Sequence, residues 1–225
     1  MKDTVRALIE GAGVVPSVRL SSIDDARFAA ETVIDAGIPI VEITMTTPQA
    51  LMLIDEIAAA RPDVAIGAGT VLDGATARAC LDAGAKFLTS PGVEAAVIAA
   101  AVKHRTLVFP GVLTPTDVIV AIEAGANLVK LFPCAPWGGA AYLKSLSAPF
   151  PDVGFIAAGG VTLKTLGEYF LAGAAAVGVG SELIPRQAVH DRDRRWITEL
   201  ARRFLGAAQQ SRVARQGQHD VSSPR

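Results

Sequence analysis

One unit repeats along this chain and leaves few folds open to it: a short apolar segment, a loop with glycine or proline, and an alanine-rich helical segment. The unit recurs roughly every 20 residues, about eight times in all. Short apolar segments that alternate with helical ones are typical of a parallel sheet covered on both faces. Eight such units favour a (β/α)8 TIM barrel, a closed parallel eight-stranded barrel, over an open doubly wound sheet.

The expected elements follow this rhythm from end to end. Strands are expected at 14–20, 39–45, 64–71, 87–90, 107–113, 127–133, 154–158 and 175–179. Helices are expected at 3–11, 24–36, 73–83, 94–103, 115–124 and 187–207, with one more opened by Pro48 and a short one ending near residue 146. We therefore expect one barrel domain at 1–207, with an extra N-terminal helix, and a mobile tail at 208–225, which is rich in Gln, Arg and Ser.

The composition argues against several classes of protein. Hydrophobic residues make up 51% of the chain and aromatic residues 5%, so we expect a core of Ala, Val, Ile and Leu. The formal net charge of -1 gives no basic surface for nucleic acid. The first residues lack the apolar core of a signal peptide, and no apolar run is long enough to cross a bilayer, so no membrane partner is expected.

Cysteine and histidine give no sign of a metal centre. Cys80 and Cys134 are the two cysteines, and they make neither a disulfide framework nor a zinc spacing, which fits a reducing cytoplasm. Cys134 is expected to serve packing, since no basic residue is positioned to activate its thiol. The three histidines show no ligand spacing and are expected to face solvent; they are His104, His190 and His219. We therefore expect no metal site.

Lys130 is a lone charge inside the apolar segment 127–133. In a strand covered on both faces its ammonium cannot easily reach water, and burial favours loss of its proton. A neutral amine in an apolar pocket is a nucleophile toward ketones, and Schiff-base lysines arise in this way. The alternative is a buried pair of Lys130 with a carboxylate that only stabilises the barrel.

Glu42 is a second lone charge, in the apolar segment 39–45. Strand alternation puts Glu42 on one face of its strand and Lys130 on one face of another, so both can point into the barrel. A carboxylate that faces an amine is suited to acid–base work on an imine. Because a carboxylate favours the charged amine while burial disfavours it, the arrangement works best if Glu42 acts through a water. A plain ion pair remains the alternative.

Two glycine-containing turns follow the last two expected strands. They are Gly159-Gly160 and Gly180-Ser181. Glycines let the backbone approach an anion, and the loops after the seventh and eighth strands form the recurrent phosphate site of this barrel. The alternative is that glycine ends these strands for steric reasons alone.

Four more residues are expected at the mouth of the barrel. Thr70 offers a hydroxyl and an amide, and Arg19 ends the first strand, where it can bind a carboxylate or make a salt bridge at the rim. Pro91 and Phe132 are apolar and either hold a small ketone or complete the core.

Six short motifs stand in a recognisable order. They are Val41-Glu42-Ile43-Thr44, Gly67-Ala68-Gly69-Thr70-Val71, Ser90-Pro91-Gly92, Phe109-Pro110-Gly111, Val129-Lys130-Leu131-Phe132-Pro133 and Gly159-Gly160-Val161. Across about residues 12–185 the chain resembles the bifunctional KHG/KDPG aldolases, which act on 4-hydroxy-2-oxoglutarate and 2-dehydro-3-deoxy-6-phosphogluconate. The resemblance implies a class I, metal-free pyruvate aldolase of carbohydrate metabolism, of the Entner–Doudoroff type, that forms a homotrimer.

The resemblance also implies roles for the residues. Lys130 forms the Schiff base and Glu42 is the acid and base, while Thr70 contacts the pyruvate carboxylate. Pro91 and Phe132 flank the pyruvate unit. The phosphate is bound by Gly159, Gly160 and Ser181. The substrate is then a 2-keto-3-deoxy-6-phospho sugar acid or 4-hydroxy-2-oxoglutarate, and the products are pyruvate with glyceraldehyde 3-phosphate or glyoxylate.

Two departures leave the substrate open. The phosphogluconate branch has Arg in place of Thr46 and Thr in place of Ala158, and the phosphogalactonate branch is more similar in its Glu strand and in an arginine like Arg19. Two other functions remain as alternatives. One is a phosphate-binding barrel isomerase or synthase with Lys130 as an acid, and the other is a non-catalytic barrel that binds sugar phosphates.

Overall fold

A computed structural model describes the backbone of residues 2–126 and 128–222, and the side chains as far as residue 215. Nine short strands form one parallel sheet in the order β5-β4-β3-β2-β1-β9-β8-β7-β6. They are β1 Val14–Val18, β2 Ile40–Thr44, β3 Ala65–Gly69, β4 Phe87–Thr89, β5 Leu107–Phe109, β6 Gly111–Val112, β7 Leu128–Leu131, β8 Gly154–Ala158 and β9 Ala176–Val179.

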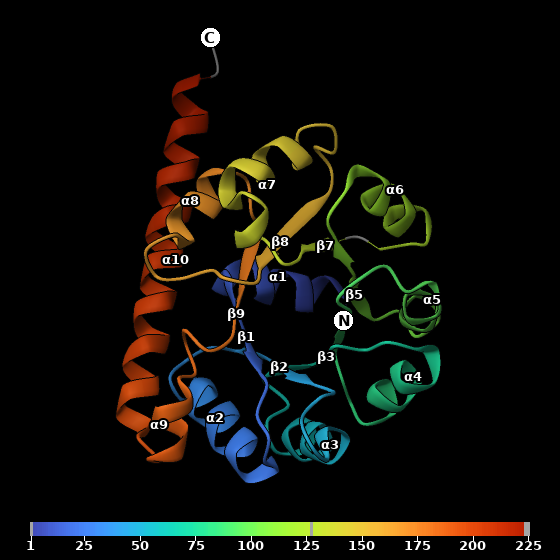
Figure 1. Ribbon diagram of the computed structural model, residues 1–225, viewed down its shortest axis with the longest axis vertical. Helices are drawn as coiled ribbons and strands as arrows, with labels where there is room; N and C mark the ends of the chain where they lie inside the picture. Colours follow the sequence, from blue (N-terminus) through green and yellow to red (C-terminus); the bar gives the residue numbers. More distant parts are fainter. Residues whose placement is uncertain (1, 127, 223–225) are drawn as a thin grey trace.

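β5 and β6 are the two halves of the strand expected at 107–113, interrupted at Pro110. Proline has no backbone N–H for the ladder, so a break at this position is expected chemically. β5 pairs with β4, and β6 pairs with β7 through Gly111 opposite Lys130. The amide of Lys130 donates to the carbonyl of Pro110 at 2.8 Å, which links the two halves of the ring. The predicted (β/α)8 TIM barrel is confirmed (Figure 1).

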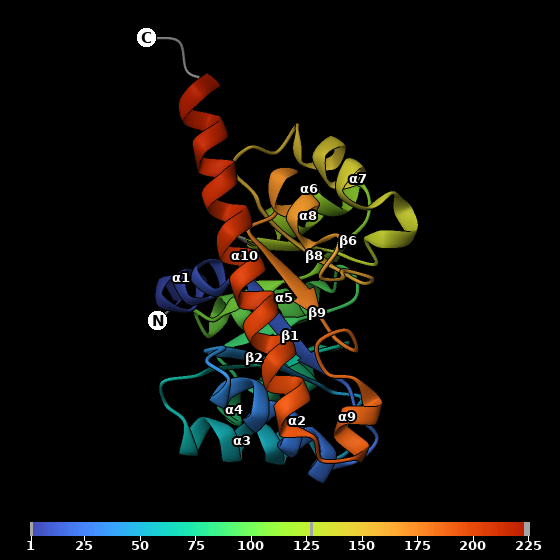
Figure 2. The same cartoon turned by 90° about the vertical axis from the view of Figure 1, so that its left-hand side faces the viewer.

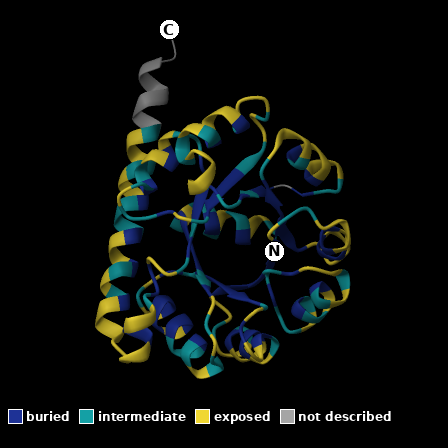
Figure 3. Ribbon diagram, viewed as in Figure 1, coloured by how far each residue is buried: buried dark blue, intermediate teal, exposed yellow. Residues whose placement is uncertain are grey.

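Helices surround the strands. The helix faces that are turned toward the strands are buried, and the faces that are turned outward are exposed (Figure 3). They are α1 Lys2–Ala12, α2 Ile23–Asp35, α3 Ala50–Ala60, α4 Gly74–Asp82, α5 Ala95–Lys103, α6 Pro115–Glu123, the 3-10 turn η1 Ala135–Trp137, α7 Gly139–Ser147, α8 Leu166–Leu171, α9 Arg186–His190 and α10 Arg194–Ser222. Polar side chains start several of them: Asp73 accepts from the amide of Thr76, and Thr114 forms a capping box with Asp117. None of the described helices combines the length and apolarity needed to cross a bilayer.

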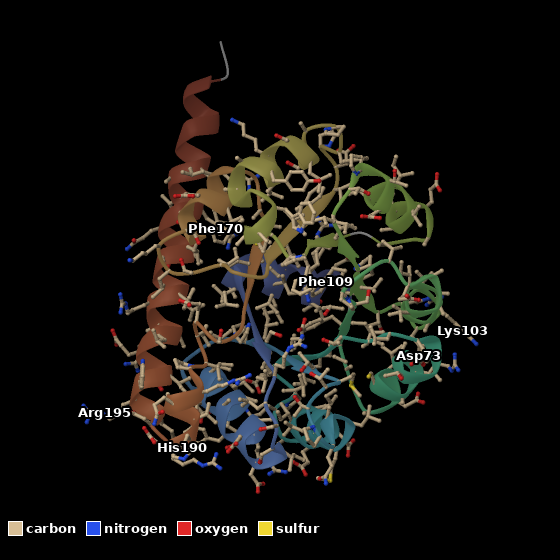
Figure 4. The ribbon with its side chains drawn as sticks, viewed as in Figure 1. Asp73, Lys103, Phe109, Phe170, His190 and Arg195 are labelled. Carbon is tan, nitrogen blue, oxygen red and sulfur yellow. The ribbon has the colours of Figure 1, made fainter. Side chains whose placement is uncertain are left out.

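The inside of the barrel is apolar at one end only. The buried residues there are Val5, Ile9, Val15, Ile40, Ala65, Phe87, Leu107, Phe109, Leu128, Ile156 and Ala176. α1 supplies the first two and covers the end of the barrel away from the β9 arrowhead (Figure 2). The rings of Phe87 and Phe109 stack at 5.3 Å, and Figure 4 shows Phe109 inside the ring of strands. This packed floor leaves the carboxyl ends of the strands as the open end.

Two helix boundaries differ from expectation because of left-handed residues. α3 begins at Ala50, since Gln49 before it has φ 56, so Pro48 precedes the helix and does not open it. The helix expected at 187–207 is divided into α9 and α10 by Arg192, which has φ 54. The Oδ1 atom of Asp193 then accepts the amide of Trp196 at 3.0 Å and starts α10.

α10 does not end at residue 207, where we expected regular structure to stop; it continues to Ser222. Ala208 is buried, and Arg212 and Arg215 donate to the carbonyls of Gly11 and Ala174 at 2.7 and 3.2 Å. Contacts of single apolar and arginine side chains therefore fix this part of the helix to the barrel, despite its polar composition. The single-domain boundary at 207 and the mobility of residues 208–225 stay predictions.

Candidate active site

Lys130 on β7 and Glu42 on β2 point into the open end of the barrel. The Lys130 side chain is 13% exposed, and its Nζ lies 3.8 Å from Oε2 of Glu42. Nζ also donates to Oγ1 of Thr89 at 3.3 Å and lies 5.3 Å from the ring centroid of Phe132. The two lone charges that stood out in the sequence therefore meet in one place.

The Glu42 carboxylate is 4% exposed and is held by two hydroxyl groups. Ser17, which lies opposite Glu42 on β1, donates to Oε1 at 2.7 Å, and Thr89 on β4 donates to Oε2 at 2.8 Å. Buried carboxylates need such donors, because an unsatisfied buried charge is costly. The carboxylate is thereby fixed beside the amine.

Thr89 stands between the acid and the amine. Its hydroxyl accepts from Nζ of Lys130 and donates to Glu42, while the separation of 3.8 Å between amine and carboxylate exceeds a direct hydrogen bond. This geometry suits proton transfer near a reacting amine better than a purely structural ion pair, which would be in direct contact.

A cavity of about 370 Å³ opens above this cluster. Eight of the residues expected at the site line it; they are Arg19, Glu42, Lys130, Phe132, Gly159, Gly160, Gly180 and Ser181. A larger cavity of about 670 Å³ lies at the opposite end of the barrel, between α1 and α10, with Arg6 and Arg215 in its wall. Because that larger cavity contains neither Lys130 nor Glu42, we assign the chemistry to the smaller one.

The Gly159-Gly160 turn needs glycine at both positions. Their φ angles are 90° and 92°, which side chains rarely adopt. A Cβ on Gly160 would lie 2.5 Å from Cβ of Ala135, and one on Gly159 would lie 2.9 Å from Cα of Pro133. Consecutive turns of this kind direct backbone N–H groups into a concavity that suits an anion.

The Gly180-Ser181 turn faces the same cavity from β9. The amides of Leu183 and Ile184 donate to the carbonyl of Gly180 at 3.0 and 2.9 Å. Both leucine and isoleucine are buried, so they anchor the turn, whereas Ser181 is exposed at the cavity rim. The two turns therefore border one side of the cavity together.

Arg19 lies at the rim and does not form the salt bridge that was its alternative role. Its Nη2 donates to Oγ1 of Thr70 at 3.0 Å, and within the described part of the chain it has no carboxylate partner. Thr70 has φ 58 and reaches the site through this hydrogen bond, since it does not itself line the cavity. A guanidinium without an ion pair at a cavity rim is suited to a carboxylate.

Pro91 is not placed in the cavity wall. The hydroxyl of Ser90 donates to the carbonyl of Gly92 at 2.6 Å and closes a tight turn. The carbonyl of Pro91 packs against Gly111, and Pro91 is exposed. Pro91 is thus outside the residues that line the cavity, and its contact with the pyruvate unit stays a prediction.

The sequence interpretation did not identify Ser17, Thr89, Thr162 or Glu182, all of which lie at the site. Ser17, Thr162 and Glu182 line the cavity, and Thr89 bridges its two charged groups. Strand alternation could have identified Ser17 and Thr89. Residues two apart on a strand share a face, and Ser17 follows Val15 by two residues as Thr89 follows Phe87. Both preceding residues point into the barrel.

None of the described cysteine and histidine residues lines the cavity. Burial raises the pKa of the Cys80 thiol to about 12 and raises the pKa of Cys134, whose Sγ lies 3.2 Å from the hydroxyl of Tyr169. His104 is exposed, as is His190 at the end of α9 (Figure 4), whereas the side chain of His219 lies outside the described residues. Among the described residues, no three His, Cys, Asp or Glu side chains gather as metal ligands do.

Comparison with known proteins agrees with this geometry. The family model of KDPG and KHG aldolases matches residues 5–200. A 2-dehydro-3-deoxy-phosphogluconate aldolase of Treponema pallidum is 34% identical over 202 residues, which cover 90% of this chain and 96% of the relative. A 2-dehydro-3-deoxy-6-phosphogalactonate aldolase of Escherichia coli K12 is 40% identical over 162 residues, which cover 71% and 78%.

One solved structure is similar to this chain over most of its length. It is the crystal structure of KDPG aldolase from Legionella pneumophila, with pyruvate captured at low pH as a covalent carbinolamine intermediate. The TM-score is 0.81 at 34% sequence identity, and the match covers 87% of this chain and 95% of that one.

Proposed function

This chain belongs to the KDPG and KHG aldolase family and is a class I aldolase, and we propose that its Schiff base forms on Lys130. The observation that carries this proposal is the amine of Lys130, 13% exposed at the base of the cavity and 3.8 Å from a carboxylate that two hydroxyls fix in place. An amine with little access to water is the nucleophile that forms imines with ketones. Glu42, with Thr89 between, is placed to move the protons.

In the proposed reaction, the lone pair of Nζ attacks the C2 carbonyl of a 4-hydroxy-2-oxo acid and forms a carbinolamine. Proton transfer through Glu42 and a bound water lets hydroxide leave as water, which gives a protonated imine. The Glu42 carboxylate, through the bound water, then removes the proton of the C4 hydroxyl, the C3–C4 bond breaks, and its electron pair moves into the imine. The aldehyde departs and an enamine remains on Lys130.

The second half returns the enzyme to its starting state. Glu42, through water, delivers a proton to C3 of the enamine, and water attacks the resulting imine to release pyruvate and the free amine. The imine itself is the electron sink, so the steps require no added cofactor. The rate gain from each positioned acid or base is typically about 10²–10⁴-fold.

The rest of the cavity suits an acid with two anionic ends. Arg19 and Thr70 are placed for the carboxylate next to the ketone, and Phe132 for the apolar face of the pyruvate unit. The two glycine turns lie where a phosphate of the aldehyde half would bind. We therefore propose pyruvate and a phosphorylated aldehyde as products, with 4-hydroxy-2-oxoglutarate as an alternative substrate.

We also propose a homotrimer in the cytoplasm. Exposed apolar side chains on α5 and α6, Val102, Ile119 and Val120, at 45%, 46% and 44% exposure, support association with further copies. Two buried free cysteines support a reducing compartment. Light scattering on the purified protein tests the trimer, and a monomer at micromolar concentration would contradict it.

The proposed function is tested by measuring pyruvate release from 2-keto-3-deoxy-6-phosphogluconate, its galactonate epimer and 4-hydroxy-2-oxoglutarate. We expect release from at least one of them, and none above background from Lys130→Arg. Arginine keeps a positive charge but cannot form the imine. Turnover by Lys130→Arg at a rate near that of the wild type would overturn the role of Lys130.

A further inference from the structure

The catalytic cavity continues sideways into a second space beyond the Ser181 turn. This space of about 250 Å³ shares Ser17, Arg19, Gly180 and Ser181 with the catalytic cavity. Its outer wall includes Arg186, the first residue of α9, and a third space of about 500 Å³ is bordered by the same two arginines. Ser181 and Arg186 therefore line the same space next to the catalytic cavity.

Arg186 carries a charge that no described carboxylate neutralises. Nearby acids are already engaged: Asp25 pairs with Arg192 at 2.9 Å, and Asp191 pairs with His190 at 2.8 Å. Glu182 borders the catalytic cavity but makes no ion pair with Arg186 within the part of the chain that the structure describes. A guanidinium without an ion pair, beside a turn that borders the catalytic cavity, is available to bind an anionic group of a ligand.

The backbone keeps Arg186 in a fixed relation to the Ser181 turn. Leu183 and Ile184 are buried, and Pro185 has φ -62, which its ring sets. The four-residue link from Ser181 to Arg186 is thus anchored at its centre. The backbone of Arg186 is therefore held beside the second space, and the reach of its guanidinium is set by side-chain rotations.

We propose that Arg186 is a specificity-determining residue that binds the phosphate monoester of the aldehyde half of the substrate. The inference rests on the proposed aldolase function, and it adds a residue that acts on one end of the substrate alone. Arg19, bonded to Thr70, serves the carboxylate beside the ketone, whereas the backbone turns supply neutral donors to the phosphate. Arg186 adds the positive charge that a dianionic phosphate needs.

The test compares Arg186→Gln with the wild type on a phosphorylated 2-keto-3-deoxy sugar acid and on the same acid without phosphate. We expect KM for the phosphorylated acid to rise about tenfold or more, the scale of a hydrogen bond to a charged group, with kcat little changed. KM for the unphosphorylated acid and pyruvate C3 deuterium exchange should stay at wild-type values. Arg186→Lys should recover part of the loss, since it restores charge without the planar fork.

Arg195→Gln is the matched control, because Arg195 is exposed and points away from the barrel at the start of α10 (Figure 4). It should leave both substrates unaffected. An unchanged KM in Arg186→Gln, or an equal loss with both acids, would overturn the role of Arg186. Failure of the aldolase proposal would look different, since the wild type itself would then show no deuterium exchange and no pyruvate release.

Discussion

The carboxylate of Glu42 fills the space that a side chain on Gly69 would need. A Cβ built on Gly69 would collide with Oε1, Cδ and Cγ of Glu42 on the adjacent strand. Because residue 69 has no side chain, the carboxylate can reach the hydroxyls of Ser17 and Thr89. Gly69 is thus required by the geometry of the acid, although it takes no part in the chemistry.

Gly69→Ala should therefore lower kcat while the barrel still folds. The methyl group displaces the end of a flexible side chain, so we expect a loss of about 10²-fold, the scale of acid–base help. The measurements are kcat with the preferred substrate and the midpoint of thermal unfolding. Gly92→Ala is the control, because a Cβ there meets no atom within 4 Å. Equal losses in both variants would contradict the steric argument.

Glu42→Gln should slow both cleavage and pyruvate C3 deuterium exchange by about 10²-fold or more. The amide keeps the shape of the side chain but cannot carry the proton, and its NH₂ group faces one of the two hydroxyl donors. Exchange followed by proton NMR isolates the enamine step from the release of the aldehyde. Exchange at the wild-type rate would remove Glu42 from the mechanism.

Thr89→Val tests the hydroxyl that lies between the amine and the acid. The substitution leaves Oε2 of Glu42 buried with one donor fewer, so we expect a loss of about 1–3 kcal/mol in the free energy of unfolding. We also expect kcat to fall by about tenfold or more, because the hydroxyl that holds the Glu42 carboxylate beside Lys130 is lost. Thr89→Ser should restore both quantities. A variant with lowered stability but unchanged kcat would show that Thr89 is structural only.

Arg19→Ala should weaken every pyruvate-derived substrate by about 1.5–3 kcal/mol, the range for a hydrogen bond to a charged group. Unlike Arg186→Gln, it should also raise the KM for pyruvate in the exchange reaction.

Ala158 has no hydroxyl to contact a sugar stereocentre, so gluconate- and galactonate-derived epimers should differ little in kcat/KM. A strong preference for the gluconate epimer, with Arg19→Ala unaffected, would contradict this description of the cavity.

The sequence predicted most of the fold because apolar strands and alanine-rich helices alternate with little variation. It also identified Lys130 and Glu42, since a single charge in an apolar strand is a strong local signal. The break of the last helix at Arg192 and its continuation to Ser222 were missed. The break lies at a residue with a left-handed backbone, and the continuation makes two hydrogen bonds from arginine side chains to carbonyls. Hydrophobic periodicity reveals neither feature.

The site was less predictable where it depends on neutral groups. Ser17 and Thr89 are small hydroxyl residues that are equally compatible with ordinary packing in a strand, so only their position on the inner face marks them. Pro91 was expected in the wall because its motif lies at a strand end. In the structure Pro91 is exposed in a turn where Ser90 donates a hydrogen bond to the carbonyl of Gly92, a contact that the spacing of the motif does not encode.

The covalent role of Lys130 is tested most directly by reducing the protein with sodium borohydride in the presence of pyruvate and mapping the product by mass spectrometry. We predict one reduced pyruvate adduct per chain, on the peptide that contains Lys130, with loss of activity in proportion to labelling. Protein reduced without pyruvate should remain unlabelled and active. An adduct on Lys144 or Lys164, or no adduct at all, would contradict the assignment of Lys130 as the Schiff-base residue.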